Sequence, residues 1–282
     1  MKEFKGKVAV ITGGATGIGR AMAERFAEEG MRIVLADVEA DVLEKTAEEM
    51  RAEGAEVLSI ACDISKREEV EHLANETVKA FSTVHVLCNN AGVGSGGYTW
   101  EIELDDWDWV LDVNLKGVVY GIHYFTPIMM KNGDACHIVN TASICGLINV
   151  PRMSAYNVAK HGVVSISETM HKELEETGSK VRISVLCPGW VNTRIHESDR
   201  NRPQGEFIRD ESNVEAMEYR EKILGNLRDG ASPIQVAQAV FDGIKAEQFY
   251  ILPQPHLRSD VEIRMRDILD NQNPTIAELF GN

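Results

Sequence analysis

The chain has 282 residues, of which 44% are hydrophobic and 26% charged, a composition typical of soluble globular proteins. Its 44 acidic residues outnumber its 29 basic ones, and the formal net charge of −15 argues against nucleic acid or anionic membranes as partners. The first apolar run, Val8 to Ile11, is too short for a signal peptide or membrane span, and the five cysteines form no C-x-x-C pair. We therefore expect a cytoplasmic protein with no disulfide framework and no metal site.

Short β-branched runs alternate with helical patterns along the chain. Most runs are apolar on both faces, which is typical of strands in a buried parallel sheet. Gly30 and Gly54 are typical helix ends, Ser65 to Glu68 of a capping box, and Ser232-Pro233 of a helix start. The alternation predicts an α/β fold with one doubly wound, mostly parallel sheet and helices on both faces, in a single domain. The seven predicted strands are Val8–Thr12, Ile33–Asp37, Val57–Asp63, Val84–Asn89, Cys136–Thr141, Ile183–Cys187 and Phe249–Leu252.

A polar, charged stretch from about residue 195 to residue 230 interrupts this alternation. It contains one helical patch and is long for a loop inside a compact domain, so it is either a functional lid or disordered. We predict a mobile flap that closes over a substrate and contributes Phe207, Met217 and Tyr219.

A glycine-rich segment with the pattern T-G-x-x-x-G-I-G runs from Thr12 to Gly19, between the first strand and a helix. Glycines let the backbone approach a pyrophosphate, and the free N–H groups of a helix start attract it. A glycine turn alone can be merely structural, but this strand–turn–helix context favours dinucleotide binding. The contacts expected from this segment are Gly13, Thr16, Gly17, Ile18 and Gly19.

Asp37 ends the second strand, 18 residues after Gly19. A carboxylate there accepts hydrogen bonds from the adenosine ribose hydroxyls and repels a 2′-phosphate. Neither Val38 nor Thr16 supplies the cation that NADP binding requires. The alternative is a surface aspartate that caps the next helix. The pattern favours NAD over NADP.

Tyr156 and Lys160 share one helix face because they are four residues apart. A free tyrosine titrates near pH ~10, and a nearby ammonium lowers that pKa toward the working range of an acid/base. Ser143, at the end of a strand, is suited to hold a substrate oxygen by a hydrogen bond. Such tyrosine–lysine pairs are also common on surface helices, so the pair alone does not decide the chemistry.

Six ordered motifs resemble the short form of the short-chain dehydrogenase/reductase family, from about residue 5 to residue 195. Three of them are the glycine turn, Ser143, and Y-x-x-x-K from Tyr156 to Lys160. The others are Asn89-Asn-Ala-Gly92, Asn114 within Val113-Asn-Leu-Lys, and Pro188-Gly189 with Thr193.

The resemblance implies a Rossmann fold and NAD-dependent hydride transfer between a secondary alcohol and a ketone. It also implies a homodimer or homotetramer. By resemblance, Tyr156 is the acid/base, Lys160 grips the nicotinamide ribose, and Asn114 anchors a water that relays the proton. The same resemblance assigns further cofactor contacts to Asp63, Ile64, Asn90, Ala91, Gly92, Tyr156, Lys160, Pro188, Gly189, Val191 and Thr193.

The substrate pocket is predicted from residues flanking this motif set: Ser143, Cys145, Met153 and Trp190, with Leu147 and Val150 beside them. They are mostly apolar and include no cation, although Arg152 and Arg194 are near in sequence. This favours an apolar, cyclic or aromatic alcohol or ketone. The alternative is that they pack against each other while arginines of the flap bind an acid.

Other interpretations stay open at this point. The chain can be an NAD-sensing regulator without chemistry, although such proteins typically lose the tyrosine or lysine that this chain keeps. It can also be an NADP-preferring carbonyl reductase. Short length and glycine spacing argue against an epimerase or dehydratase. We expect structural roles for His137, His161, Trp107 and Trp109, and either adenine contact or helix capping for Asp63.

Overall fold

The computed structural model describes residues 1–203 and 214–276, and its seven strands form one sheet in the order β3-β2-β1-β4-β5-β6-β7. Every neighbouring pair is parallel, which confirms the predicted doubly wound α/β sheet. The strand order reverses between β1 and β4, so a crevice is expected beyond their carboxyl ends. The strands are β1 (Val8–Thr12), β2 (Arg32–Asp37), β3 (Val57–Ala61), β4 (Val86–Asn89), β5 (Cys136–Thr141), β6 (Val181–Leu186) and β7 (Tyr250–Ile251).

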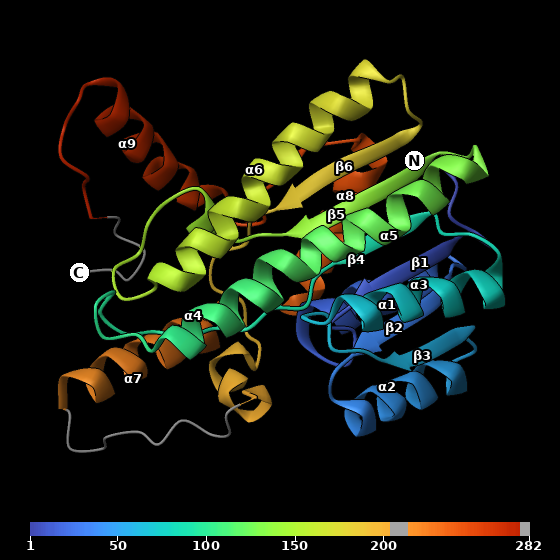
Figure 1. The fold of residues 1–282 in the computed structure, drawn as a ribbon, viewed down its shortest axis with the longest axis horizontal. Coiled ribbons are helices and arrows are strands. Elements are labelled where there is room, and N and C mark those ends of the chain that lie inside the picture. Colours follow the sequence, from blue (N-terminus) through green and yellow to red (C-terminus); the bar gives the residue numbers. More distant parts are fainter. Residues whose placement is uncertain (204–213, 277–282) are drawn as a thin grey trace.

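Helices cover both faces of this sheet (Figure 1). One core lies between the sheet and α1, α2 and α8, and the other between the sheet and α3, α4, α5 and α6. In Figure 1, α7 and α9 lie on the side toward which the arrow of β6 points. The helices are α1 (Gly17–Glu28), α2 (Ala40–Ala52), α3 (Arg67–Phe81), α4 (Leu104–Leu111), α5 (Gly117–Asn132), α6 (Ser154–Glu176), α7 (Val214–Arg228), α8 (Pro233–Ala246) and α9 (Arg258–Leu269).

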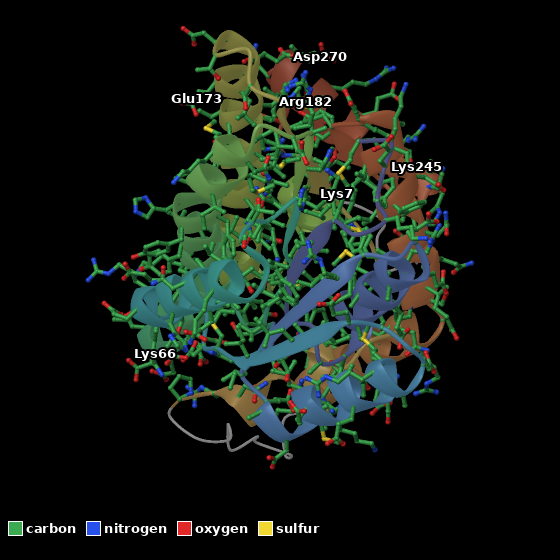
Figure 2. The ribbon with its side chains drawn as sticks, turned by 90° about the vertical axis from the view of Figure 1, so that its right-hand side faces the viewer. Lys7, Lys66, Glu173, Arg182, Lys245 and Asp270 are labelled. Atoms are coloured by element: carbon green, nitrogen blue, oxygen red, sulfur yellow. The ribbon has the colours of Figure 1, made fainter. Side chains whose placement is uncertain are left out.

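Strand β1 shows why the sheet is buried on both sides. Successive side chains of a strand point to opposite faces, so Val8 and Val10 enter one core while Ala9 and Ile11 enter the other. Each large aliphatic side chain buried in this way contributes about 1.5–3 kcal/mol. Charged side chains such as Glu173, Lys245 and Asp270 lie at the outside of the molecule (Figure 2).

The local helix signals are confirmed in part. Ser232 caps α8, since its hydroxyl accepts from the N–H of Gln235 while the Gln235 side chain accepts from the N–H of Ser232. Gly30 and Gly54 follow α1 and α2 with φ of +76° and +96°. The predicted capping box from Ser65 to Glu68 is wrong: α3 begins at Arg67, and the Ser65 hydroxyl donates to Asp63 at 2.6 Å instead.

The region predicted as a flap contains regular structure on both sides of residues 204–213. A 3-10 segment, Ile195–Asn201, is followed after that gap by α7. The hydroxyl of Ser198 accepts from the N–H of Gly94 at 3.0 Å and so ties the 3-10 segment to the loop after β4. Phe207 lies outside the described residues. Within the described ranges, no helix combines the length and apolar character needed to cross a membrane.

Candidate active site

A cavity of about 800 Å³ lies along the carboxyl ends of the strands. Its wall includes almost every residue predicted for the site, from the glycine turn through Asp37 to the segment after β6. Gly19 and Asn114 are not on the wall. The predicted residues on the wall are Gly13, Thr16, Gly17, Ile18, Asp37, Asp63, Ile64, Asn90, Ala91, Gly92, Ser143, Cys145, Met153, Tyr156, Lys160, Pro188, Gly189, Trp190, Val191 and Thr193.

The glycine turn brings bare backbone to the cavity. Gly13 and Gly17 have φ of +64° and +57°, a region that side chains disfavour. At Gly19 a Cβ atom would lie 2.0 Å from the carbonyl oxygen of Gly13, so the turn closes onto α1 only with glycine there. The first turn of α1 has no acidic residue, and Gly17 and Ile18 of that turn line the cavity, a setting in which free N–H groups suit an anion.

Two carboxylates lie at the carboxyl ends of neighbouring strands: Asp37 is the last residue of β2, and Asp63 follows β3 by two residues. Asp37 accepts hydrogen bonds from the N–H groups of Ala15 at 3.0 Å and Glu39 at 3.1 Å, and burial raises its pKa. Asp63 accepts from the N–H and hydroxyl of Ser65. Burial raises the pKa of Asp63, but Ser65 and Lys66 outweigh that effect and bring it below its usual value. Asp63 therefore holds a loop turn and does not cap α3.

Asn90 joins three strand ends. Its side-chain nitrogen donates to the backbone carbonyl of Thr12 at 3.0 Å, and its side-chain oxygen, Oδ1, accepts from the hydroxyl of Thr141 at 3.3 Å. The N–H groups of Asn90 and Ala91 both donate to the Thr12 hydroxyl. These bonds explain why the short motif after β4 has a fixed position beside the glycine turn.

Ser143, Tyr156 and Lys160 meet at the same part of the wall. Ser143 precedes a short 3-10 turn, where its hydroxyl accepts from the N–H of Cys145 at 3.2 Å. The ammonium of Lys160 lies 5.5 Å from the ring centroid of Tyr156 and donates to the carbonyl of Thr141 at 2.9 Å. All three side chains are buried.

The expected lowering of the tyrosine pKa does not occur in this structure. Burial raises the pKa of Tyr156 well above its usual value, and only the Ser143 hydroxyl opposes that rise. Lys160 is buried as well, and burial lowers its pKa to about 8. The spacing of Tyr156 and Lys160 in the sequence predicted that they lie close together, but it did not predict the desolvation that governs both pKa values.

Asn114 lies behind the wall in a π-helical turn, Asp112–Lys116, between α4 and α5. Such single-turn interruptions of α-helices frequently occur at functional sites. The side chain of Asn114 is fully buried and bonded to the backbone of Val93, one residue after Gly92.

The segment after β6 completes the wall. The carbonyl of Pro188 accepts from the Ser143 hydroxyl at 3.3 Å. A Cβ at Gly17 would lie 3.3 Å from the methyl group of Thr193, so Thr193 lies directly opposite the glycine turn. Val191 is buried and pairs with Ala231 as an isolated bridge.

A sequence profile described as short chain dehydrogenase matches residues 7–204. The chain belongs to the short-chain dehydrogenase family. This confirms the predicted family, its Rossmann-type fold and the oxidoreductase class.

Individual members of the family are similar over most of this dehydrogenase. A short-chain dehydrogenase/reductase from Burkholderia phymatum, solved in complex with NAD, is 43% identical with a TM-score of 0.94, covering 98% of this chain and 99% of that one. A "CLA biosynthesis dehydrogenase/reductase" of Lactiplantibacillus plantarum is 30% identical, covering 100% of this chain and 99% of the relative. A cyclohexanol dehydrogenase of an Acinetobacter species is 32% identical, covering 86% and 95%.

The substrate end of the dehydrogenase differs from the prediction in two ways. Leu147 and Val150 pack within a small hydrophobic cluster and do not line the cavity, unlike Cys145, Met153 and Trp190. Cations do line it. Among them, Arg152 donates to the hydroxyl of Tyr98 at 2.7 Å and forms an ion pair with a glutamate of α7, Glu215.

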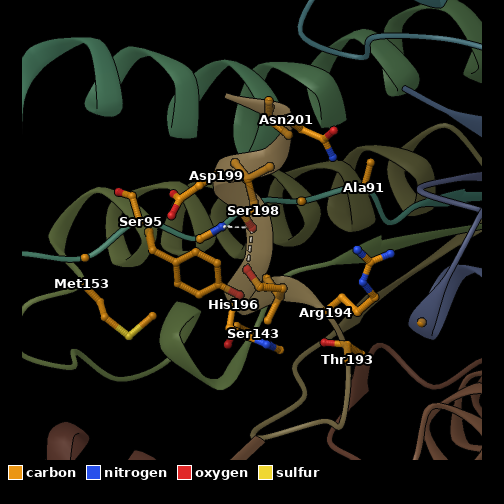
Figure 3. Close-up of a pocket in the computed structure, with 18 of the residues that line it drawn as sticks. Ala91, Ser95, Ser143, Met153, Thr193, Arg194, His196, Ser198, Asp199 and Asn201 are labelled. Atoms are coloured by element: carbon orange, nitrogen blue, oxygen red, sulfur yellow. Dashed lines mark hydrogen bonds between the residues drawn. The ribbon is translucent and has the colours of Figure 1, made fainter. Parts of the chain in front are cut away.

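Helix α7 and the 3-10 segment add wall residues that motif spacing could not identify. Met217 and Tyr219 of α7 line the cavity as predicted for the flap. From the 3-10 segment come His196, whose Nδ1 is buried with no hydrogen-bond partner among the described residues, and Arg200. In Figure 3, His196 is drawn between Met153 on one side and Arg194 on the other. No local pattern marks His196 or Arg200, because long-range contacts bring them to the wall.

The residues expected to be structural lie within strands and helices, and one of them, Trp109, also lines the cavity. His137 is fully buried in β5, where Nε2 lies 2.7 Å from the Ser184 hydroxyl. His161 contacts the carbonyl of Asn157, one turn earlier on α6. Trp107 and Trp109 of α4 belong to the core on that face. Among the residues that the structure describes, no three His, Cys, Asp or Glu side chains gather as metal ligands would.

Proposed function

We propose that this dehydrogenase uses NAD to interconvert a secondary alcohol and its ketone, with Tyr156 as acid/base. The observation that carries the proposal is the buried group of Ser143, Tyr156 and Lys160 on the same cavity wall as the glycine turn and Asp37. The similar protein from Burkholderia phymatum was solved with NAD, which supports the choice of cofactor.

The chain's own residues fit a dinucleotide. The bare backbone at Gly13 and Gly17 and the helix start at α1 suit a pyrophosphate. Asp37 is placed to accept from ribose hydroxyls, and Lys160 to donate to the second ribose. When bound, nicotinamide accepts or gives the hydride. We assign Asp63, Ile64, the Asn90–Gly92 loop and the segment from Pro188 to Thr193 to the remaining cofactor contacts.

In this proposal, Ser143 binds the substrate oxygen and Tyr156 exchanges a proton with it. The Ser143 hydroxyl holds the substrate oxygen, and the Tyr156 hydroxyl gives its proton to that oxygen in reduction and takes it back in oxidation. The raised pKa keeps Tyr156 protonated at neutral pH, which suits the donor role. The Lys160 ammonium and a water anchored at Asn114 return the proton.

For the substrate we propose a mainly apolar, cyclic or aromatic secondary alcohol or ketone. Cys145, Met153, Trp190 and Met217 present apolar surface to the cavity, and Arg152 is already paired with Glu215. The similarity to a cyclohexanol dehydrogenase supports this class. A hydroxy acid is the second candidate, because its carboxylate can replace Glu215 on Arg152.

The test is nicotinamide absorbance with purified protein, NAD, and a panel of cyclohexanol, a polyol and a hydroxy acid. We expect NAD reduction, with the highest kcat/KM for the neutral cyclic alcohol. NAD binding without turnover of any panel member or of larger alcohols favours a sensing protein instead. Preference for the hydroxy acid that Arg152→Gln abolishes favours the acid substrate.

We further propose a cytoplasmic homodimer or homotetramer in which α5 and α6 form the contact between copies. Exposed apolar side chains on these helices, Val119 and Val158, support this contact. Sedimentation velocity tests the assembly, and Val158→Asp should weaken it.

A further inference from the structure

A second carboxylate stands beside Asp37. The N–H of Glu39 donates to Asp37 at 3.1 Å, and both residues line the cavity. Glu39 occupies the N-cap of α2, where a side chain usually accepts from the helix backbone, yet it makes no capping bond. Its side chain is engaged elsewhere.

Glu39 instead holds the 3-10 segment, 161 residues farther along the chain. Arg200 donates to its Oε1 from Nε at 2.8 Å and from Nη2 at 2.6 Å, and Asn201 donates to the same oxygen at 3.1 Å. The other guanidinium nitrogen of Arg200 donates to the carbonyls of Arg194 and Glu197. Only 18% of the Glu39 side chain and 27% of the Arg200 side chain are exposed.

This pair is electrically neutral. Burial raises the pKa of Glu39, but the bonds from Arg200 and Asn201 outweigh it, so the pKa lies below its usual value and the carboxylate is ionised at neutral pH. The positive charge of Arg200 is therefore cancelled within a few ångströms. The Asp37 carboxyl group accepts from the backbone N–H groups of Ala15 and Glu39, and among the described residues it forms no ion pair.

We propose that Glu39 makes the dehydrogenase select NAD by neutralising Arg200, a guanidinium that otherwise binds the 2′-phosphate of NADP. A guanidinium matches phosphate with a planar fork of donors. The proposal rests on the proposed nucleotide site and deepens it: selectivity comes from the pair as well as from Asp37. Arg200, 163 residues after Asp37 in the sequence, is therefore a cation that binds NADP only when Glu39 does not neutralise it.

The experiment measures the Kd of NADH and NADPH by nicotinamide fluorescence in the intact protein. Glu39→Gln should tighten NADPH binding about tenfold while NADH binding changes by less than about threefold, because one charge-assisted contact becomes available. High salt should shrink the gain. Arg200→Gln, which leaves Glu39 without its ion-pair partner, should weaken NADPH binding further. The double variant should lose the gain of Glu39→Gln.

The matched control is Glu262→Gln on α9, which removes an exposed carboxylate from its pair with Arg266 far from the cavity. It should leave both Kd values unchanged. An unchanged NADPH/NADH ratio in Glu39→Gln, or a gain that survives in the double variant, overturns the inference while the NAD site stands. If the unmodified protein binds neither nucleotide, the proposed function fails and the inference with it.

Discussion

The side chain of Asn114 is joined to the backbone of Val93 by two hydrogen bonds of 2.8 Å: its oxygen accepts from the Val93 N–H, and its nitrogen donates to the Val93 carbonyl. The pair ties the π-helical turn Asp112–Lys116 to the loop that follows β4. That loop includes Asn90, Ala91 and Gly92, so the position of part of the proposed cofactor site depends on one buried amide.

Asn114→Ala should therefore reduce both stability and cofactor affinity. It leaves two backbone groups without a partner in a buried place, which costs about 2 kcal/mol or more in the free energy of unfolding. The Kd of NAD should rise at least several-fold, as measured by fluorescence titration. Asn132→Ala is the control, because Asn132 bonds Thr83 and Val84 at the opposite end of the sheet. A loss of stability alone in Asn114→Ala would contradict the positioning role.

Tyr156→Phe should leave NAD binding nearly unchanged while kcat falls by ~10² or more, as expected for loss of a proton-transfer group. Single-turnover rates and NAD titrations check the two halves separately. Tyr250→Phe is the comparison, since that hydroxyl bonds Glu168 at the surface, and turnover should stay within about twofold. Wild-type turnover in Tyr156→Phe under chemistry-limited conditions would remove the acid/base assignment.

Asp37→Ser combined with Val38→Arg should weaken NAD binding and strengthen NADP binding, each by about tenfold. The carboxylate that repels a 2′-phosphate is lost, and a guanidinium appears at Val38, whose side chain is half exposed at the cavity. Kd values for both cofactors measure the exchange, with Asp270→Ser on the surface as control. Equal affinity of the unmodified protein for NAD and NADP would argue against selection by Asp37.

His137 should make stability depend on pH in the acid range. Burial lowers its pKa from 6.5 to about 3, so the unfolded chain takes up a proton below pH 6.5 while the folded chain stays neutral until near pH 3. Above pH 6.5 this residue costs no stability. As the pH falls below 6.5 the free energy of unfolding decreases, and the loss reaches about 2 kcal/mol at pH 5.

Denaturant unfolding at pH 7 and pH 5 measures this effect. His137→Val should reduce the loss of stability between the two pH values, whereas His123→Val on the exposed face of α5 should not. An unchanged pH dependence in His137→Val would show that other groups cause it.

Local sequence patterns predicted most of the architecture because they report short-range physics. Strands β1 and β5 begin and end at the predicted residues, since apolar β-branched runs bounded by turns have few alternatives. Strand β3 ends at Ala61, two residues early, because its partner β2 ends at Asp37 and leaves nothing to pair with. The capping box failed because Asp63 engages Ser65.

The site residues that belong to local sequence motifs were predictable. Those that only the fold brings together were not. The glycine turn, Asp37, Ser143, Tyr156 and Lys160 reach one cavity as expected. The contact between Glu39 and Arg200 joins residues 161 positions apart, which no local pattern reveals.

In the parallel sheet, groups that affect stability and groups of the proposed active site lie at opposite ends of the strands. Every strand ends at the same rim, so His137, at the start of β5, and Ser143, just past its end, lie at opposite rims. The opposite rim carries the ion pair of Lys7 with Asp134, and His85 beside it. Evolution can therefore adjust resistance to acid or heat at one rim and substrate preference at the other, and laboratory selection for each trait should accumulate substitutions on different sides of the molecule.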